Sequence, residues 1–171
     1  INRPKVFVSM ASFVRLKSFG SIELMSNDTF TETSFASNLS GTDMITVNMD
    51  VENFQCTVSG TSSIVAKGIA KNQFIQTTGD LDFRGFELLG ENVNIDVSGI
   101  GNLEVNATQT LDVKITGTAT VYYKGNPTHI DSKSLAGYYT RCRFPRCGVW
   151  VVQYPRSIAL PAIILKRVEF H

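Results

Sequence analysis

Apolar and polar residues alternate along most of the chain, and a short phrase of an apolar residue, a small hydroxyl residue and glycine interrupts this alternation at regular intervals. The clearest copies are Val58-Ser59-Gly60, Val97-Ser98-Gly99 and Ile115-Thr116-Gly117. The repeated glycines are Gly41, Gly60, Gly79, Gly99, Gly117 and Gly137, spaced 18 to 20 residues apart. A fixed period of this length is typical of a solenoid, in which each repeat forms one coil and stacks on the next.

The apolar positions keep a constant distance from each glycine. Gly20, 21 residues before Gly41, fits the start of the same series. Four residues after Gly20 and the next five glycines stand Leu24, Ile45, Ile64, Phe83, Leu103 and Val121. Two residues before the six repeated glycines stand Leu39, Val58, Thr77, Val97, Ile115 and Leu135, of which Thr77 alone is polar. Within one repeat, Val93, Ile95 and Val97 alternate with polar residues, which is the period of a strand with one buried face. We therefore expect the apolar side chains of one coil to stack on their counterparts in the next.

These patterns predict an all-β, single-domain β-solenoid with regular coils of about 19 residues over residues 39–137. A right-handed parallel β-helix is the favoured form, because parallel crossovers are almost always right-handed. We expect each repeated glycine to supply the positive φ that a sharp turn between strands needs. Before the regular coils, residues 5–14 predict a first strand, and residues 26–38, rich in Ser, Thr and Asn, predict a loop.

The repeat pattern stops after Gly137, so we divide the chain into a solenoid domain, 1–137, and an irregular basic tail, 138–171. Residues 1–137 contain ten Lys/Arg and fourteen Asp/Glu, whereas the tail contains six and one. The tail either folds back as a C-terminal cap over the open end of the solenoid or is loosely ordered. Its apolar stretch, 149–165, contains two prolines, Gln153 and Arg156, and does not predict a transmembrane helix.

The three cysteines have different expected roles. Cys56 stands in an inward column and is expected to be a small core residue. Cys142 and Cys147 are close enough in sequence to form a local disulfide in an oxidising compartment. As a zinc pair they lack two further ligands, because His129 and His171 have no motif spacing.

Three features of the sequence resemble the putative auto-transporter adhesin, head GIN domain family. They are the repeated phrase, the stretch Asn92-Val93-Asn94-Ile95-Asp96-Val97-Ser98-Gly99, and the stretch Val121-Tyr122-Tyr123-Lys124-Gly125-Asn126-Pro127. The resemblance covers about residues 39–137. It implies a right-handed parallel β-helix, an extracellular or cell-envelope location and no established activity. The word adhesin in the family name rests on analogy. The tail departs from the pattern, since family members tend to finish near the final glycine.

Candidate chemistry is sparse. Asp80 and Asp82 flank Leu81 and should share an outward face, so acidic residues of this kind, with Glu104 and Asp112 on later coils, could form a calcium-assisted lyase site. Arg84 or Lys114 would then be the basic partner. The simpler interpretation is that outward positions on strands are polar. Only His129 lies within the array, so a nucleophilic triad is not expected.

Aromatic residues offer a different kind of site. Tyr123 falls in an inward column, so Tyr122 should face solvent beside Lys124. An exposed ring next to a cation could stack on a sugar, or it could shield the edge of the sheet. The candidate ligand-face residues are therefore Tyr122, Lys124, Asp80 and Asp82, with no catalytic, cofactor-binding or metal-binding residues predicted.

The leading functional hypothesis is a non-enzymatic, adhesin-like surface or envelope module that binds protein or glycan through a solenoid face. The alternative is a carbohydrate-active parallel β-helix enzyme of the polysaccharide lyase or hydrolase type. The arginines Arg141, Arg143 and Arg146 could contact an anionic glycan or nucleic acid. No nucleic-acid-binding motif accompanies them, so no nucleic-acid partner is expected.

Overall fold

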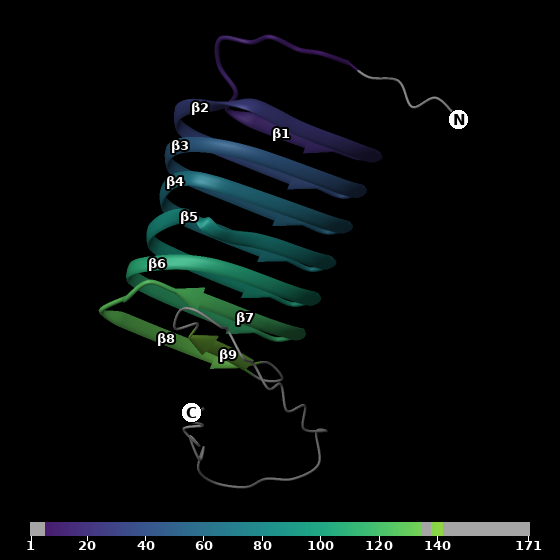
Figure 1. Cartoon of the computed structure of the whole chain (residues 1–171). Helices are drawn as coiled ribbons and strands as arrows, with labels where there is room; N and C mark the ends of the chain where they lie inside the picture. Colours follow the sequence, from purple (N-terminus) through teal and green to yellow (C-terminus); the bar gives the residue numbers. More distant parts are fainter. Residues whose placement is uncertain (1–5, 135–137, 142–171) are drawn as a thin grey trace, which may run out of the picture.

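The computed structural model describes residues 6–134 and 138–141, which form a stack of parallel β-coils (Figure 1). The strands are β1 Arg15–Ser18, β2 Ser21–Leu39, β3 Thr42–Val58, β4 Thr61–Thr77, β5 Asp80–Val97, β6 Ile100–Ile115, β7 Thr118–Lys124, β8 His129–Ser134 and β9 Tyr138–Arg141. They pair in the order β1-β2-β3-β4-β5-β6-β7-β9, and β8 pairs with β6. No helix that could cross a membrane occurs in the described part of the chain.

Each of the strands β2 to β6 runs through most of one coil and curves around one side of the stack (Figure 1). The pairing register places Ile45 beside Ile64 and Ile64 beside Phe83, so the predicted apolar columns are confirmed. The result is a β-solenoid of about 6 turns with coils of about 19 residues, as the glycine spacing predicts. Its right-handed sense stays a prediction.

The inward columns fill the interior of the solenoid. The rings of Phe35 and Phe54 stack at 5.9 Å between centroids, and Phe54 meets Phe83 at 6.3 Å. Phe54 on β3 precedes a glycine turn and Phe83 on β5 follows one, so side chains from both sides of the turns meet in the interior, across neighbouring coils. Burial of each such side chain contributes roughly 1.5–3 kcal/mol, and only stacked coils bury it on all sides.

The repeated glycines that the structure describes, from Gly41 to Gly117, do not have the positive φ that we predicted. Among the described glycines, positive φ occurs at Gly68 and Gly125, which lie away from the glycine turns. A Cβ on Gly79 would instead overlap the carbonyl oxygen of Gly60, and a Cβ on Gly60 would overlap that of Gly41. Glycine is required here because the turns stack directly on one another, leaving no room for a side chain.

Two predictions about the N-terminal part of the chain are wrong. Residues 26–38 are not a loop but lie in β2, where the threonines and Ser34 are exposed and Phe35 and Ser37 are buried. Residues 6–14 form no strand, because they lie at the end of the stack, where no neighbouring strand pairs with them. Phe13, the exception among their largely exposed side chains, packs on Phe30 and Phe35 with centroids 5.3 and 4.9 Å apart.

The ladder continues past the glycine at which the sequence pattern stops. β9 pairs in parallel with β7, with Tyr138 beside Thr120 and Arg141 beside Tyr123. Strand pairing therefore extends four residues beyond the boundary predicted at 137. The predicted cap and the pairing of Cys142 with Cys147 concern residues outside the described part of the chain.

Polar residues interrupt the inward columns at a few positions that the apolar pattern does not predict. Asp43 is buried, and one of its carboxylate oxygens accepts a hydrogen bond from the Ser18 hydroxyl at 2.6 Å. Gln73 is buried where neighbouring coils have Phe54 and Val93, and its amide donates to the carbonyl oxygens of Ala70 and Leu88 at 3.3 and 3.5 Å. The interior is therefore not purely apolar.

Candidate functional site

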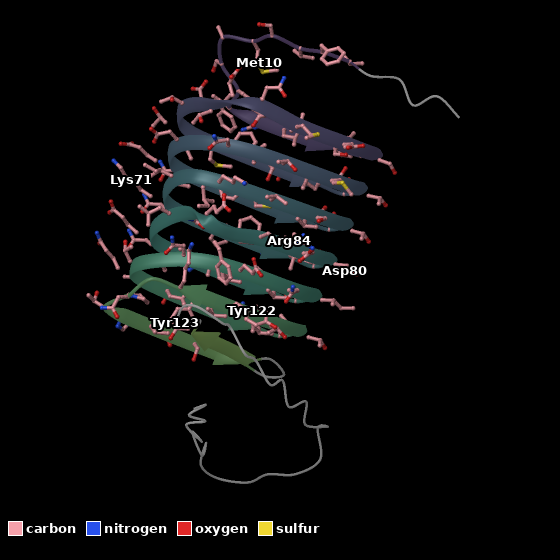
Figure 2. The ribbon with its side chains drawn as sticks, viewed as in Figure 1. Met10, Lys71, Asp80, Arg84, Tyr122 and Tyr123 are labelled. Carbon is pink, nitrogen blue, oxygen red and sulfur yellow. The ribbon has the colours of Figure 1, made fainter. Side chains whose placement is uncertain are left out.

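The outward side chains form two faces, one on each side of the core. The first face consists of the outward residues that follow the glycine turns, in 42–48, 61–67, 80–86, 100–106 and 118–124. The second face consists of the outward residues that precede the glycine turns, in 34–38, 53–57, 72–76, 92–96, 110–114 and 129–133. Figure 2 shows Asp80 and Lys71 at opposite sides of the stack, where the chain turns from one face to the other.

All four predicted ligand-face residues lie on the first face. Asp80 and Asp82 project outward on β5 on either side of the buried Leu81, as the alternation predicts. Tyr122 and Lys124 lie on β7, two coils further along the stack. The solenoid thus brings both pairs to one surface but does not gather them into a single cluster.

The carboxylate of Asp82 already has protein partners. One oxygen lies 3.0 Å from a guanidinium nitrogen of Arg84, and the other accepts a hydrogen bond from the Asn102 amide at 3.3 Å. Glu104 is the register neighbour of Arg84, and partial burial raises the pKa of its carboxyl. Arg84 opposes this increase in the pKa, whereas the charge of Asp82 adds to it. These groups form a partly exposed ladder of charges.

Tyr122 and Lys124 are both half-buried, so Tyr122 is less exposed than we expected. The ammonium group of Lys124 lies 5.6 Å from the centroid of the Phe86 ring, within the range of a cation–π contact. Tyr123 points inward and is 7% exposed, as predicted. The cation of Lys124 therefore lies over an aromatic ring that the sequence analysis did not consider.

The residues considered for an enzyme site are divided between the two faces. Glu104 lies with Asp82 on the first face, whereas Asp112, Lys114 and His129 lie on the second. Lys114 pairs with Asp96, its ammonium nitrogen 3.1 Å from a carboxylate oxygen. Within the described residues, no group of three or more His, Cys, Asp or Glu side chains is arranged to hold a metal ion.

The second face carries a ladder of amides that the sequence analysis missed. The Asn72 amide donates to the side-chain oxygen of Asn53 at 3.1 Å, and the Asn92 amide donates to that of Asn72 at 2.9 Å. The Thr110 hydroxyl continues the series by donating to Asn92 at 2.9 Å. The signal was present in the sequence, because each of these residues stands seven positions before a repeated glycine.

A shallow groove of about 460 Å³ lies along this amide ladder. Its outward lining includes Asn53, Gln55, Asn72, Phe74, Asn92, Asn94, Thr110 and Asp112. Phe74 stands between Gln55 and Asn94 in the pairing register and is 38% exposed. An aromatic side chain surrounded by amides is the most distinctive feature of the second face.

A smaller groove of about 320 Å³ continues the second face toward β8. It is lined by charged residues, among them Asp112, Lys114, Asp131 and Lys133. Asp131 lies 3.7 Å from Lys133 on the same strand, whereas the Asp96–Lys114 pair joins the neighbouring strands β5 and β6. The second face thus changes along the stack from amides to paired charges.

Comparison with known proteins identifies the chain at the level of its family. No curated protein and no solved structure matches it significantly. A family model does match residues 1–127, which include the first 38 residues that the motif-based resemblance left out. Since this match covers more than half of the chain, the protein belongs to the putative auto-transporter adhesin, head GIN domain family.

Proposed function

We propose that this protein is a non-enzymatic, adhesin-like module of the cell surface or envelope that binds a protein or glycan through an outward face of its solenoid. The observation that carries this proposal is the form of the two faces. Both are built from in-register side chains on a parallel ladder, and the second face of the described part of the chain carries two shallow grooves. Membership of an adhesin-like family supports the same function.

The first-face residues Asp80, Asp82, Tyr122 and Lys124 are proposed contact residues within this function. They present carboxylates on β5 and an aromatic ring with a cation on β7. A ligand contacting both pairs would have to extend along the stack across about two coils, which is a distance of roughly 10 Å. An extended peptide or a glycan chain meets this requirement.

The distribution of acidic residues argues against the alternative of a polysaccharide lyase or hydrolase. A glycosidase needs two carboxyl groups facing one scissile bond, one of them free to protonate the leaving group. Here Glu104 and Asp112 lie on different faces, and Asp82 is neutralised by Arg84. We therefore propose binding without turnover.

Binding and turnover can be tested on the same samples. The full chain is applied to an array of neutral and anionic glycans, and to surfaces coated with collagen, fibronectin or mucin. We expect saturable binding to at least one probe, no release of reducing ends or unsaturated products with or without calcium, and weaker binding after a change on the contacted face. The variant Tyr122→Ala/Lys124→Ala tests the first face, and Lys71→Ala, at the far end of the coil, is the control.

Two results would contradict the proposal. Absence of binding to every probe would remove the adhesin-like function. Turnover of a polysaccharide that disappears in Asp80→Ala/Asp82→Ala would favour the enzyme. The proposed location is tested separately, by treating intact cells of the source organism with a protease and asking whether the protein is cleaved.

A further inference from the structure

Some N–H groups of the amide ladder are not used in hydrogen bonds within the ladder. An asparagine side chain has two N–H donors and a carbonyl oxygen that can accept two hydrogen bonds. Asn72 and Asn92 each use one N–H and one lone pair within the ladder, at 2.9–3.1 Å. The second N–H of each side chain is left for a ligand, and the ladder bonds hold the amide planes in a fixed orientation.

The next column on the same face supplies further groups. The side chains of Gln55, Asn94 and Asp112 form no hydrogen bond or ion pair with other described residues, and all three line the 460 Å³ groove. Phe74 is in the same column, between Gln55 and Asn94. A flat apolar ring therefore has hydrogen-bonding groups on both sides along the stack.

We propose that this groove binds a neutral glycan, with one pyranose ring lying over Phe74 and its hydroxyl groups contacting the neighbouring amides. This inference rests on the proposed function and specifies its ligand and its surface. A pyranose ring has an apolar C–H face and a rim of hydroxyls, which suits an aromatic ring surrounded by fixed donors and acceptors. A linear glycan running along the solenoid axis would meet amides on three successive coils, those of β3, β4 and β5.

The composition of the groove distinguishes this ligand from the alternatives. None of the residues lining it is cationic, and its one carboxylate, Asp112, would repel an anionic chain. Lys114, on the neighbouring column, is already paired with Asp96. A protein interface usually has an apolar and aromatic centre, whereas Phe74 is the one large apolar side chain exposed on this groove.

Rigidity of the groove favours a polar ligand that forms few contacts. Ordering a free amide side chain on binding costs conformational entropy, which weakens the binding of small polar ligands. Asn72 and Asn92 are already ordered by the ladder, and all groove residues project from paired strands. The hydroxyls of a glycan would therefore meet donors that need little rearrangement.

The test measures binding of defined hexasaccharides to the full chain by titration calorimetry. The neutral probes are the β-1,4-linked glucose, mannose and xylose hexamers and the α-1,4-linked glucose hexamer, and galacturonate hexamer is the anionic probe. We expect at least one neutral hexamer to bind better than galacturonate, and Phe74→Ala to raise its Kd about tenfold. Gln55→Ala/Asn94→Ala should weaken binding similarly, and Phe74→Trp should retain it.

Phe19→Ala is the matched control, because it removes an exposed phenylalanine at a glycine turn, away from the groove. Its Kd should equal that of the unmodified chain, and thermal melting should show that every variant is folded. Neutral-glycan binding that survives Phe74→Ala but is lost in Tyr122→Ala/Lys124→Ala would overturn this inference while leaving the proposed function intact. Failure of all neutral hexamers to bind, or tighter binding of galacturonate, would also overturn it, and the protein-coated surfaces would then decide the proposed function.

Discussion

Replacing Gly79 with alanine tests whether the glycine turns stack as tightly as the structure indicates. The new Cβ would overlap the carbonyl oxygen of Gly60 and lie 2.7 Å from the carbonyl atoms of Ser59. The same Gly60 oxygen accepts a hydrogen bond from the backbone N–H of Asp80 at 2.9 Å. Because all of these groups belong to the backbone, no change of side-chain rotamer relieves the overlap, and the two coils must separate at the turn.

The magnitude follows from three effects. Overpacking of this kind costs about 1–3 kcal/mol, and weakening one or two backbone hydrogen bonds costs about 0.5–1.5 kcal/mol each. Alanine also restricts the unfolded chain, which offsets about 0.4–1 kcal/mol. The expected net loss in the free energy of unfolding is about 3 kcal/mol, and for a chain of this length it lowers Tm by roughly 6–12 °C.

Thermal melting followed by circular dichroism measures the effect, with two controls. Thr78→Ala changes an exposed side chain in the same turn and should alter the free energy of unfolding by less than about 0.5 kcal/mol. Gly20→Ala places a Cβ where no atom lies within 4 Å, because no earlier turn stacks on Gly20. If Gly20→Ala is as destabilising as Gly79→Ala, or if Gly79→Ala melts like Thr78→Ala, the steric explanation is wrong.

Two further predictions concern the interior. Ile64→Asp buries a charge in the column that contains Ile45 and Phe83 and should lower the free energy of unfolding by about 4 kcal/mol or more. Thr61→Asp changes an exposed residue beside Gly60 and should alter Tm little, so equal losses of Tm in the two variants would contradict the inward register. Burial raises the pKa of the Cys56 thiol from 9.0 to about 11, so above pH 9 the unfolded chain loses this proton before the folded chain does. The free energy of unfolding should therefore fall by about 3 kcal/mol between pH 9 and 11 relative to that of Cys56→Ala, measured by urea denaturation. Cys142 and Cys147 are replaced by serine in both proteins. If the free energies of the two proteins change in the same way across this pH range, the thiol is not buried.

The inward columns could be predicted from the sequence because burial imposes a simple rule on them. Each coil repeats the strand alternation at a constant distance from glycine, so the spacing alone assigns Ile45, Ile64 and Phe83 to one column, and the pairing register confirms it. The same rule failed over 26–38, where Ser, Thr and Asn outnumber apolar residues. Those residues are a strand because β3 pairs with them in parallel over most of their length, from Thr29 onward. Composition alone does not reveal such a partner.

The reason for the glycines could not be obtained from the sequence either. A glycine at a turn commonly indicates positive φ, and Gly68 and Gly125 show that this solenoid does use that conformation. At Gly60 and Gly79 the requirement comes from the neighbouring coil, whose backbone occupies the space of a side chain. A contact between turns 19 residues apart has no local signature beyond the repetition itself.

The candidate surfaces were predicted less completely, because acids, bases and aromatic rings are the outward residues whose chemistry a sequence makes obvious. Asp80, Asp82, Tyr122 and Lys124 are of this kind, and the structure places them together on the first face. The asparagines of the second face have no titratable group and no aromatic ring to distinguish them. They nevertheless stand at the same interval as the glycines, so the period that identified the core also marks this surface.

The amide ladder alone would not justify a binding site, because stacked asparagines also stabilise parallel strands by bonding from one coil to the next. Asn53, Asn72 and Asn92 can be explained in that way without any ligand. Phe74 cannot, since an exposed phenylalanine contributes little to the stability of the fold and raises the risk of association with other chains. The case for a glycan therefore depends on Phe74 and its unbonded neighbours Gln55 and Asn94, and it is at these three residues that substitution separates a structural ladder from a ligand-binding surface.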